Sequence, residues 1–240
     1  MHSVGTHLAF IGDKTLTWVD GPLMIAVGSV WCYWFLVVFL SFYRRYKTGQ
    51  CGAIKPRQRA DRWLMRGWAV IIIMWNAFPA AALRKDEPPW GPFADALEMP
   101  LLAVRWGSGV IVLACLTLTC YCWYIMGRSW SVAIVKEDEE QPLVTTGAFG
   151  IVRHPIYALS ALMITMTAVT CASLPIAIVA LVHVMLLNIK AKREEQALIG
   201  VFGDEYRHYM HQTGGFVPKL YNAKTPSRQD AKDSAHNLQG

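Results

Sequence analysis

Charged side chains are scarce in this chain: 17% of its 240 residues are charged and 54% are hydrophobic. This composition lies well outside the soluble average and is typical of a chain with long membrane-embedded segments. The net charge of +6 would also suit nucleic acid. The basic residues, however, are concentrated in the gaps between apolar runs, which is where membrane proteins carry them. We therefore predict an integral membrane protein and no nucleic-acid partner.

Patterns that mark several other kinds of site are missing. The six cysteines form no C-x-x-C pair with a second pair at zinc spacing, and most lie inside apolar runs. We expect them to be small apolar fillers, with no metal site and no disulfide framework. No Walker or Rossmann glycine pattern is present, which argues against a nucleotide polyphosphate as ligand. The first twenty residues lack a basic start followed by a cleavage site, so we expect the first apolar run to remain as an anchor.

Uncharged runs dominate what is present. Three of them, 22–43, 67–83 and 106–126, are each close to the roughly 20 residues that a helix needs to cross the hydrocarbon. A fourth run, 157–189, is too long for one span, and the segment 171–175 supplies a break. Ser173 is expected to be the N-cap of the second arm, and Pro175 suits its first turn. The predicted fold is an all-α integral membrane protein with five transmembrane helices, of which the last two form a helical hairpin.

The flanking charges predict the orientation. The first loop, 44–62, is strongly basic, the second loop, 84–98, has more acids than bases, and the segment after residue 189 is basic again. Basic loops remain in the cytoplasm, so we expect the N-terminus outside and the C-terminus in the cytoplasm, in a bacterial inner membrane. We divide the chain into three N-terminal transmembrane helices (1–126), a cytoplasmic loop with the hairpin and a C-terminal helix (127–221), and a disordered tail (222–240).

The loop that enters the hairpin carries the first candidate site residues. Gly147 and Gly150 would let backbone amides approach a ligand closely. Pro155 suits the first turn of the fourth helix, which leaves His154 near a helix N-terminus, where an anionic or carboxylate-bearing ligand is favoured. The alternative is that His154 merely caps the helix and Arg153 contacts lipid phosphate.

The second set of candidates lies on the fifth helix, which we expect to continue past the bilayer to residue 200. Glu194 and Glu195 would lie about one turn beyond the interface, with Lys190 one turn before Glu194 on the same face. A Glu–Lys pair at this spacing is usually plain helix surface, but a carboxylate here could bind the ammonium group of an amino-acid-like ligand. Because the two arms are of similar length, we expect Glu194 to approach His154. The combination favours a zwitterionic, cationic cofactor.

His183 is the remaining ionisable residue of note within the fifth span. Ionisable groups inside a membrane are expensive and merit a functional hypothesis. A hydrogen-bonded core histidine is the simpler interpretation, with a proton relay as the alternative.

The two sets occur in an ordered pattern: L-V-T-T-G-A-F-G-I-V-R-H-P-I-Y (143–157), then the hairpin, then E-E-Q-A-L (194–198) and F-G-D-E-Y-R-H-Y (202–209). Over residues 129–218 the chain resembles the isoprenylcysteine carboxyl methyltransferase family, integral-membrane methyltransferases that are similar to phospholipid methyltransferases. The resemblance implies S-adenosylmethionine as cofactor, in a cytoplasm-facing pocket closed by the loop and the C-terminal segment. It implies as cofactor contacts Gln141, Leu143, Val144, Phe149, His154, Tyr157 and Glu194.

Two positions depart from the family pattern. Phe149 stands where the family commonly has a tyrosine, so a hydroxyl contact is lost and the ring face remains. Lys190 stands where the eukaryotic enzymes have an arginine associated with the substrate carboxylate, and lysine lacks the bidentate fork of arginine. His154, Lys190 and Glu194 are the candidate catalytic residues that the resemblance implies.

The expected activity is methyl transfer to a lipophilic small molecule or lipidated acceptor that reaches the pocket laterally from the membrane lipid. Prenylated cysteine, a small thiol, a phospholipid amine and another isoprenoid acid all stay open as acceptors. Two alternatives remain: a nicotinamide-dependent sterol-type reductase, whose members typically have more spans, and a non-catalytic membrane protein or small transporter. The sequence carries no signal for an oligomeric state.

Overall fold

The computed structural model describes residues 10–11, 14–15, 20–48, 59–83, 94–127 and 142–219. Helices dominate the described part of the chain, together with one short hairpin of two strands. The elements are β1 (Phe10–Ile11), β2 (Lys14–Thr15), α1 (Gly21–Thr48), α2 (Arg59–Ala82), α3 (Ala94–Met126), the 3-10 turn η4 (Gly147–Gly150), α4 (Pro155–Cys171), α5 (Leu174–Phe202) and α6 (Asp204–Gln212). The predicted all-α fold is confirmed, apart from this two-residue pairing.

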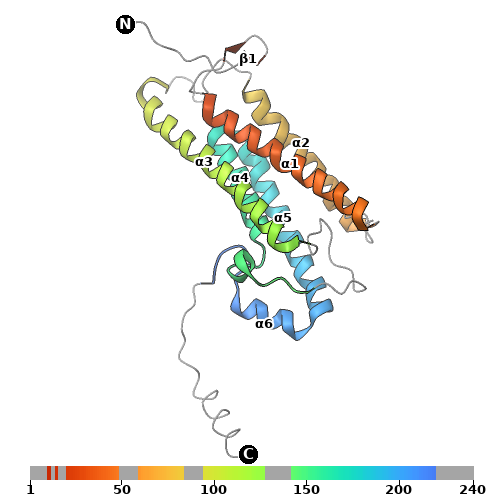
Figure 1. Ribbon diagram of the computed structural model, residues 1–240. Coiled ribbons are helices and arrows are strands. Elements are labelled where there is room, and N and C mark those ends of the chain that lie inside the picture. The colour runs from red at the N-terminus through yellow and green to blue at the C-terminus, as the bar shows by residue number, and fades with distance from the viewer. Residues whose placement is uncertain are drawn as a thin grey trace, which may run out of the picture.

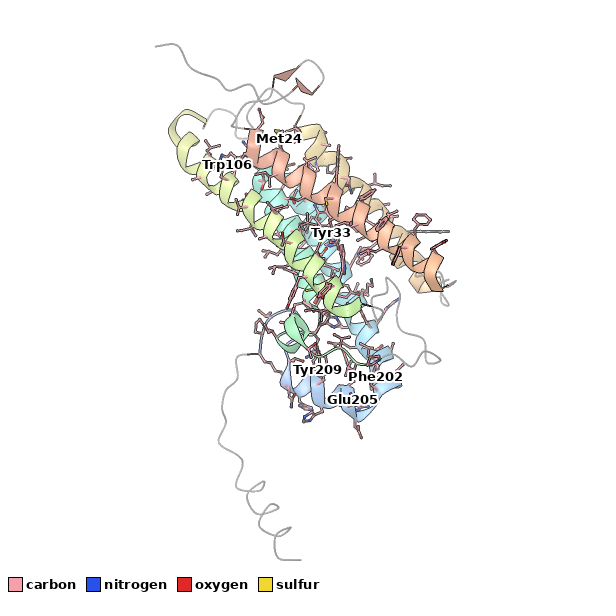
Figure 2. All side chains as sticks on the ribbon, in the orientation of Figure 1. Met24, Tyr33, Trp106, Phe202, Glu205 and Tyr209 are labelled. Carbon is pink, nitrogen blue, oxygen red and sulfur yellow. The ribbon has the colours of Figure 1, made fainter. Side chains whose placement is uncertain are left out.

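The five long helices lie lengthwise beside one another, and η4 and α6 lie together at one end of the bundle (Figure 1). Met24 and Trp106 are at the opposite end, Tyr33 is near the middle, and Tyr209 and Glu205 lie beyond the bundle on the α6 side (Figure 2). The loop that precedes α4 and the end of α5 therefore meet at the same end of the molecule, as the predicted hairpin requires.

Each apolar run of the sequence is helical in the structure. Three segments are long and apolar enough to cross a membrane, namely Gly21–Tyr43, Leu101–Met126 and Leu174–Phe202, and the apolar helix α4 is shorter. Helix α2 covers residues 67–82 of the predicted run 67–83 but begins at Arg59, and α3 begins well before residue 106. A helix does not have to end where its apolar stretch ends, because its backbone bonds are satisfied internally. The five-span count and the orientation stay predictions.

The turn between α4 and α5 has a left-handed residue at its centre. Ala172 has φ 45° and ψ 42°, and its amide donates to the carbonyls of Ala168 and Val169, which closes the end of α4. Ser173 is the N-cap of α5 in extended conformation, but its side chain makes no capping bond, and Pro175 lies in the first turn. The predicted break is confirmed in position, and backbone bonds close it.

Tight packing of large side chains holds the bundle together. Trp75, Met163 and Val112 are fully buried in one apolar cluster that draws on all five long helices. Arg105, which the sequence places at the edge of the third span, is buried and donates its Nε to the carbonyl of Thr170 at 2.8 Å. Ser108 and Thr170 share a second hydrogen bond of 2.8 Å, so polar contacts tie α3 to α4 near the hairpin turn.

The described residues leave out several segments of the three predicted parts, namely much of the first loop (44–62), the loop segment 128–141 and the tail 222–240. The predicted C-terminal helix is present as α6, and it lies directly after α5 with only Gly203 between them.

Candidate functional site

The loop before α4 is folded tightly against α3. Gly147 has φ +60°, a region that favours glycine, and a Cβ at this position would lie 2.5 Å from Cδ1 of Ile125. The 3-10 turn η4 follows, and its Phe149 is buried. Gly147, which we expected to let a ligand approach the backbone, therefore allows the loop to pack on the end of α3.

The C-terminal segment after α6 completes the loop from the other side. Val152 and Gly214 form an isolated parallel β-bridge. The amide of Arg153 donates to the carbonyl of Gly214 at 2.8 Å, and the amide of His154 donates to the carbonyl of Gly215 at 3.1 Å. A Cβ on Gly214 would overlap the carbonyl oxygen of Val217, so the segment 214–219 doubles back at a point that accepts glycine alone. Sequence reasoning missed this contact, for which the Gly214–Gly215 pair was the available signal.

Arg153, His154 and Glu195 form a polar cluster where the loop meets the end of α5. Arg153 Nε donates to Oε1 of Glu195 at 2.8 Å, and Nε2 of His154 lies 3.1 Å from the same oxygen. Arg153 Nη1 also donates to the carbonyls of Met210 and Thr213. Arg153 therefore ties the loop to the segment around α6, which differs from the lipid-phosphate contact considered from the sequence. His154 occupies the N-cap position of α4, but its side chain makes no capping bond.

Glu194 points to a different partner. The hydroxyl of Tyr157 donates to Oε2 of Glu194 at 2.6 Å. The ring of Tyr157 also stacks on the imidazole of His154, with centroids 5.4 Å apart and planes 4° apart. His154 and Glu194 are therefore gathered at one end of the bundle, as the hairpin predicted, with Tyr157 between them.

Lys190 lies over two aromatic rings. Its Nζ is 4.4 Å from the centroid of Trp68 on α2 and 5.0 Å from the centroid of Tyr157 on α4. Contacts of this kind stabilise a cation within the apolar part of a protein. The ammonium group is thereby held between α2 and the hairpin, one turn before Glu194.

These side chains line a cavity of about 510 Å³ between the long helices, a size that suits a small-molecule ligand. Its wall is mainly apolar and aromatic. Of the predicted site residues it includes Phe149, His154, Tyr157, Lys190 and Glu194. Leu143 and Val144 are partly buried but do not line this cavity, and Gln141 lies outside the described residues.

Tyr209 of α6 contacts the 3-10 turn η4, whose Phe149 lines the cavity. Its hydroxyl donates to the carbonyl of Phe149 at 2.5 Å. Burial raises the pKa of Tyr209 to about 12, although Arg153 and Thr213 act in the opposite direction. The phenol therefore keeps its proton at physiological pH and holds η4 against α6. The sequence analysis named neither Tyr209 nor Arg153 as a site residue. For Tyr209, the charged and aromatic residues of α6 were the available signal.

Comparison with known proteins gives an independent view of the same region. Residues 108–200 match the model of the isoprenylcysteine carboxyl methyltransferase family. The cobalt-zinc-cadmium resistance protein CzcN of Cupriavidus metallidurans is 28% identical over 96 residues, which are 40% of this chain and 44% of that protein. The methanethiol S-methyltransferase of a Pseudomonas species is 24% identical over 158 residues, which are 65% of this chain and 57% of that protein. The matches thus span about half the length of these curated relatives.

The family match runs from the middle of α3 through the loop and the hairpin to the end of α5, and it includes His154, Tyr157, Lys190 and Glu194. The region that forms most of the cavity is thus the region that carries the sequence likeness. The predicted resemblance to the isoprenylcysteine carboxyl methyltransferase family is confirmed over residues 108–200, which match the model of that family.

Proposed function

We propose that the protein is an integral-membrane methyltransferase that transfers a methyl group from S-adenosylmethionine to a lipophilic acceptor, in the manner of an isoprenylcysteine carboxyl O-methyltransferase. The observation that carries the proposal is the cavity whose polar end is built from the residues of the family match. Its relatives include a protein named as a methyltransferase, which supports this reaction class over the reductase and the non-catalytic alternatives.

The side chains at the polar end of the cavity fit this cofactor. S-adenosylmethionine supplies an electrophilic methyl group on a sulfonium. The carboxylate of Glu194 suits an ammonium group, and the ring faces of Tyr157 and Phe149 suit a cationic or planar group. We assign these three residues, with His154, to cofactor binding, and we extend the assignment to Leu143, Val144 and Gln141 from the resemblance.

The remaining residues of the site would align the acceptor and exclude water. Displacement at a sulfonium disperses charge in the transition state, so the protein contributes chiefly alignment and desolvation. Lys190 is placed to face an anionic acceptor group, because it lines the cavity one turn before Glu194. His154 is held by the backbone of Gly215 and by Glu195, which fixes its ring beside Tyr157.

The apolar wall of the cavity supports an acceptor with a hydrocarbon body that enters from the lipid between helices. A prenylated cysteine carboxylate suits the family, and a thiol suits the relative that is named for methanethiol. We place the polar end of the cavity at the cytoplasmic face of a bacterial inner membrane, since the basic loops favour that orientation.

Incubation of membranes that contain the protein with S-adenosylmethionine bearing a labelled methyl group tests the proposal, with the labelled product identified by mass spectrometry. We expect a labelled lipophilic product with the wild-type protein and a loss of label with Glu194→Gln. Calorimetry with S-adenosylmethionine and with a nicotinamide nucleotide separates the two enzyme classes. Tight binding of the nicotinamide nucleotide alone would replace the methyltransferase with the reductase, and binding of neither would leave the non-catalytic alternative.

A further inference from the structure

A second polar group of side chains lies deeper in the cavity than the Glu194 end. His183 of α5 is 2% exposed, and its Nε2 lies 3.0 Å from Oγ of Ser160 on α4. Ser160 and Tyr33 of α1 also line the cavity. His183 precedes Glu194 by three turns of α5, or about 16 Å along the helix axis. This group is therefore separate from the polar end assigned to the cofactor.

Aromatic rings enclose the imidazole of His183. The ring of Trp68 lies nearly parallel to it, with centroids 6.0 Å apart and planes 19° apart, and Trp75 lies 5.3 Å away at 56°. These contacts fix the orientation of the ring, together with the bond to Ser160. A histidine held at one nitrogen and packed against two indole rings presents its other nitrogen in a defined direction.

Three polar atoms of this region have no hydrogen-bond partner in the part of the chain that the structure describes. They are Nδ1 of His183 and the indole Nε1 atoms of Trp34 and Trp68. An unmade hydrogen bond of a buried polar group costs free energy, so such atoms are rare in proteins and require an explanation. Trp75 Nε1 is also unpaired within the described residues, but Trp75 does not line the cavity, whereas the other three residues do.

The charge of the surroundings restricts what can bind there. His183 is buried within the bundle, and Lys190 lies two turns further along α5, so a second positive charge on the imidazole is disfavoured. A neutral imidazole offers either one donor or one acceptor at Nδ1, and the two indoles offer donors. Atoms of these kinds match a neutral group that can both donate and accept hydrogen bonds.

We propose that His183, Trp34 and Trp68 form a polar subsite of the cavity that binds a neutral hydrogen-bonding group, such as a hydroxyl, amide or thiol, on an otherwise apolar molecule. This inference rests on the proposed function insofar as that molecule is the methyl acceptor. The subsite selects, among lipophilic acceptors of similar size, those that carry such a group at the depth of His183.

Two substitutions of His183 separate its two nitrogens. The side-chain amide of asparagine is attached at Cγ, as Nδ1 is, and the amide of glutamine is attached one atom further out, as Nε2 is. His183→Asn therefore keeps a hydrogen-bonding group in the place of Nδ1. His183→Gln keeps the bond toward Ser160 and loses Nδ1. His211→Gln, at an exposed position of α6, is the matched control.

The test uses full-length protein in detergent micelles with 1-dodecanol and dodecane as probes, whose apparent affinities are obtained from ligand-dependent shifts in thermal unfolding. We expect the wild-type protein, His183→Asn and His211→Gln to bind dodecanol about fivefold more tightly than dodecane, which is the value of one ordinary hydrogen bond. His183→Gln is expected to lose this preference. No preference in the wild-type protein, an unchanged preference in His183→Gln, or an equal loss in both His183 variants would overturn the proposal.

The labelled-methyl assay separates this inference from the proposed function. A protein that prefers dodecanol as described but transfers no methyl group would retain the subsite and overturn the methyltransferase. In the active enzyme, His183→Gln should raise KM for the acceptor about fivefold at unchanged kcat, the signature of lost ground-state binding. An equal fall of kcat with KM unchanged would overturn the subsite and leave the reaction in place.

Discussion

His154 and Glu195 lie 3.1 Å apart, between the imidazole Nε2 and the carboxylate Oε1, although 41 residues separate them in the chain. The hairpin of α4 and α5 brings them together, and Arg153 donates to the same carboxylate oxygen. The neighbouring Glu194 is bonded to Tyr157 and lines the cavity. The two adjacent glutamates thus make separate contacts: Glu195 fastens the loop, and Glu194 lines the cavity in which we propose that the ligand binds.

Glu194→Gln should weaken binding of S-adenosylmethionine about 10-fold to 100-fold, the value of a hydrogen bond to a charged group. Tyr157 can still donate to the amide oxygen, so the fold should persist. Isothermal titration calorimetry measures the effect, and Glu205→Gln, at an exposed position of α6, is the control. Equal affinities in the two variants would contradict the assignment of Glu194 to the cofactor.

Arg153→Lys should loosen the segment around α6. Arginine donates at once to Glu195 and to two carbonyls at the end of α6, and a lysine ammonium cannot reproduce this geometry. We expect faster hydrogen exchange over residues 204–215 and a loss of about 2 kcal/mol in the free energy of unfolding. Arg207→Lys, at an exposed residue, should change neither quantity, and the same exchange in both variants would refute the role of Arg153.

Tyr209→Phe tests the bond between α6 and η4. Because the folded protein raises the pKa of Tyr209 to about 12, this residue contributes stability that is complete below its unfolded pKa of about 10. The contribution is lost as the pH rises from about 10 to about 12. Unfolding of the wild-type protein should therefore become easier over this pH range by a larger amount than in the phenylalanine variant. Parallel curves for the two proteins would count against the contact.

Gly214→Ala should prevent the C-terminal segment from closing on the loop. The added Cβ would overlap the backbone carbonyl of Val217, which no side-chain movement can relieve. We expect loss of cofactor binding and rapid proteolysis after α6. Gly200→Ala, at a helical position with open space around it, should instead leave binding intact and stabilise α5 by up to about 1 kcal/mol. Binding by Gly214→Ala at wild-type affinity would show that the segment is dispensable.

Arg105→Met should lower the melting temperature without affecting the site. Arg105 joins α3 to the carbonyl of Thr170, and its loss should cost about 2 kcal/mol. Its chain neighbour Trp106 lies at the end of the bundle opposite α6 (Figure 2). Affinity for S-adenosylmethionine should equal that of the wild-type protein when measured well below the melting temperature. Lys192→Met, at an exposed position of α5, should keep the wild-type melting temperature.

The helices and the hairpin break were predictable because each follows from a local signal. Uncharged runs must be helical in lipid, and Ser173 with Pro175 marks the start of α5. The meeting of the loop with the end of α5 followed from the antiparallel arrangement of the two arms. The choice of Glu194 over Glu195 came from the family resemblance and not from a local signal, since adjacent residues on a helix differ in direction by about 100° and only packing decides which one lines the cavity.

The part of the site contributed by residues 209–216 was not predictable from sequence spacing. Its contacts are chiefly backbone hydrogen bonds, such as those of Gly214 and Gly215 with Arg153 and His154, and apart from the glycine pair itself these leave no residue-type signature. The position of the Lys190 side chain was not predictable from sequence spacing either. Its place over Trp68 depends on how α2 packs against α5, which apolar periodicity in membrane helices encodes weakly.

The bond from the amide of His154 to the carbonyl of Gly215 gives the molecule a built-in reporter. That amide can exchange its proton with solvent only when the arm that follows α6 lifts away from the loop. Its exchange rate therefore reports how often the segment after α6 opens, at a residue that lines the proposed ligand cavity. Saturation with ligand should slow the hydrogen exchange of the His154 amide, and the resonance of this one amide would then measure the opening rate.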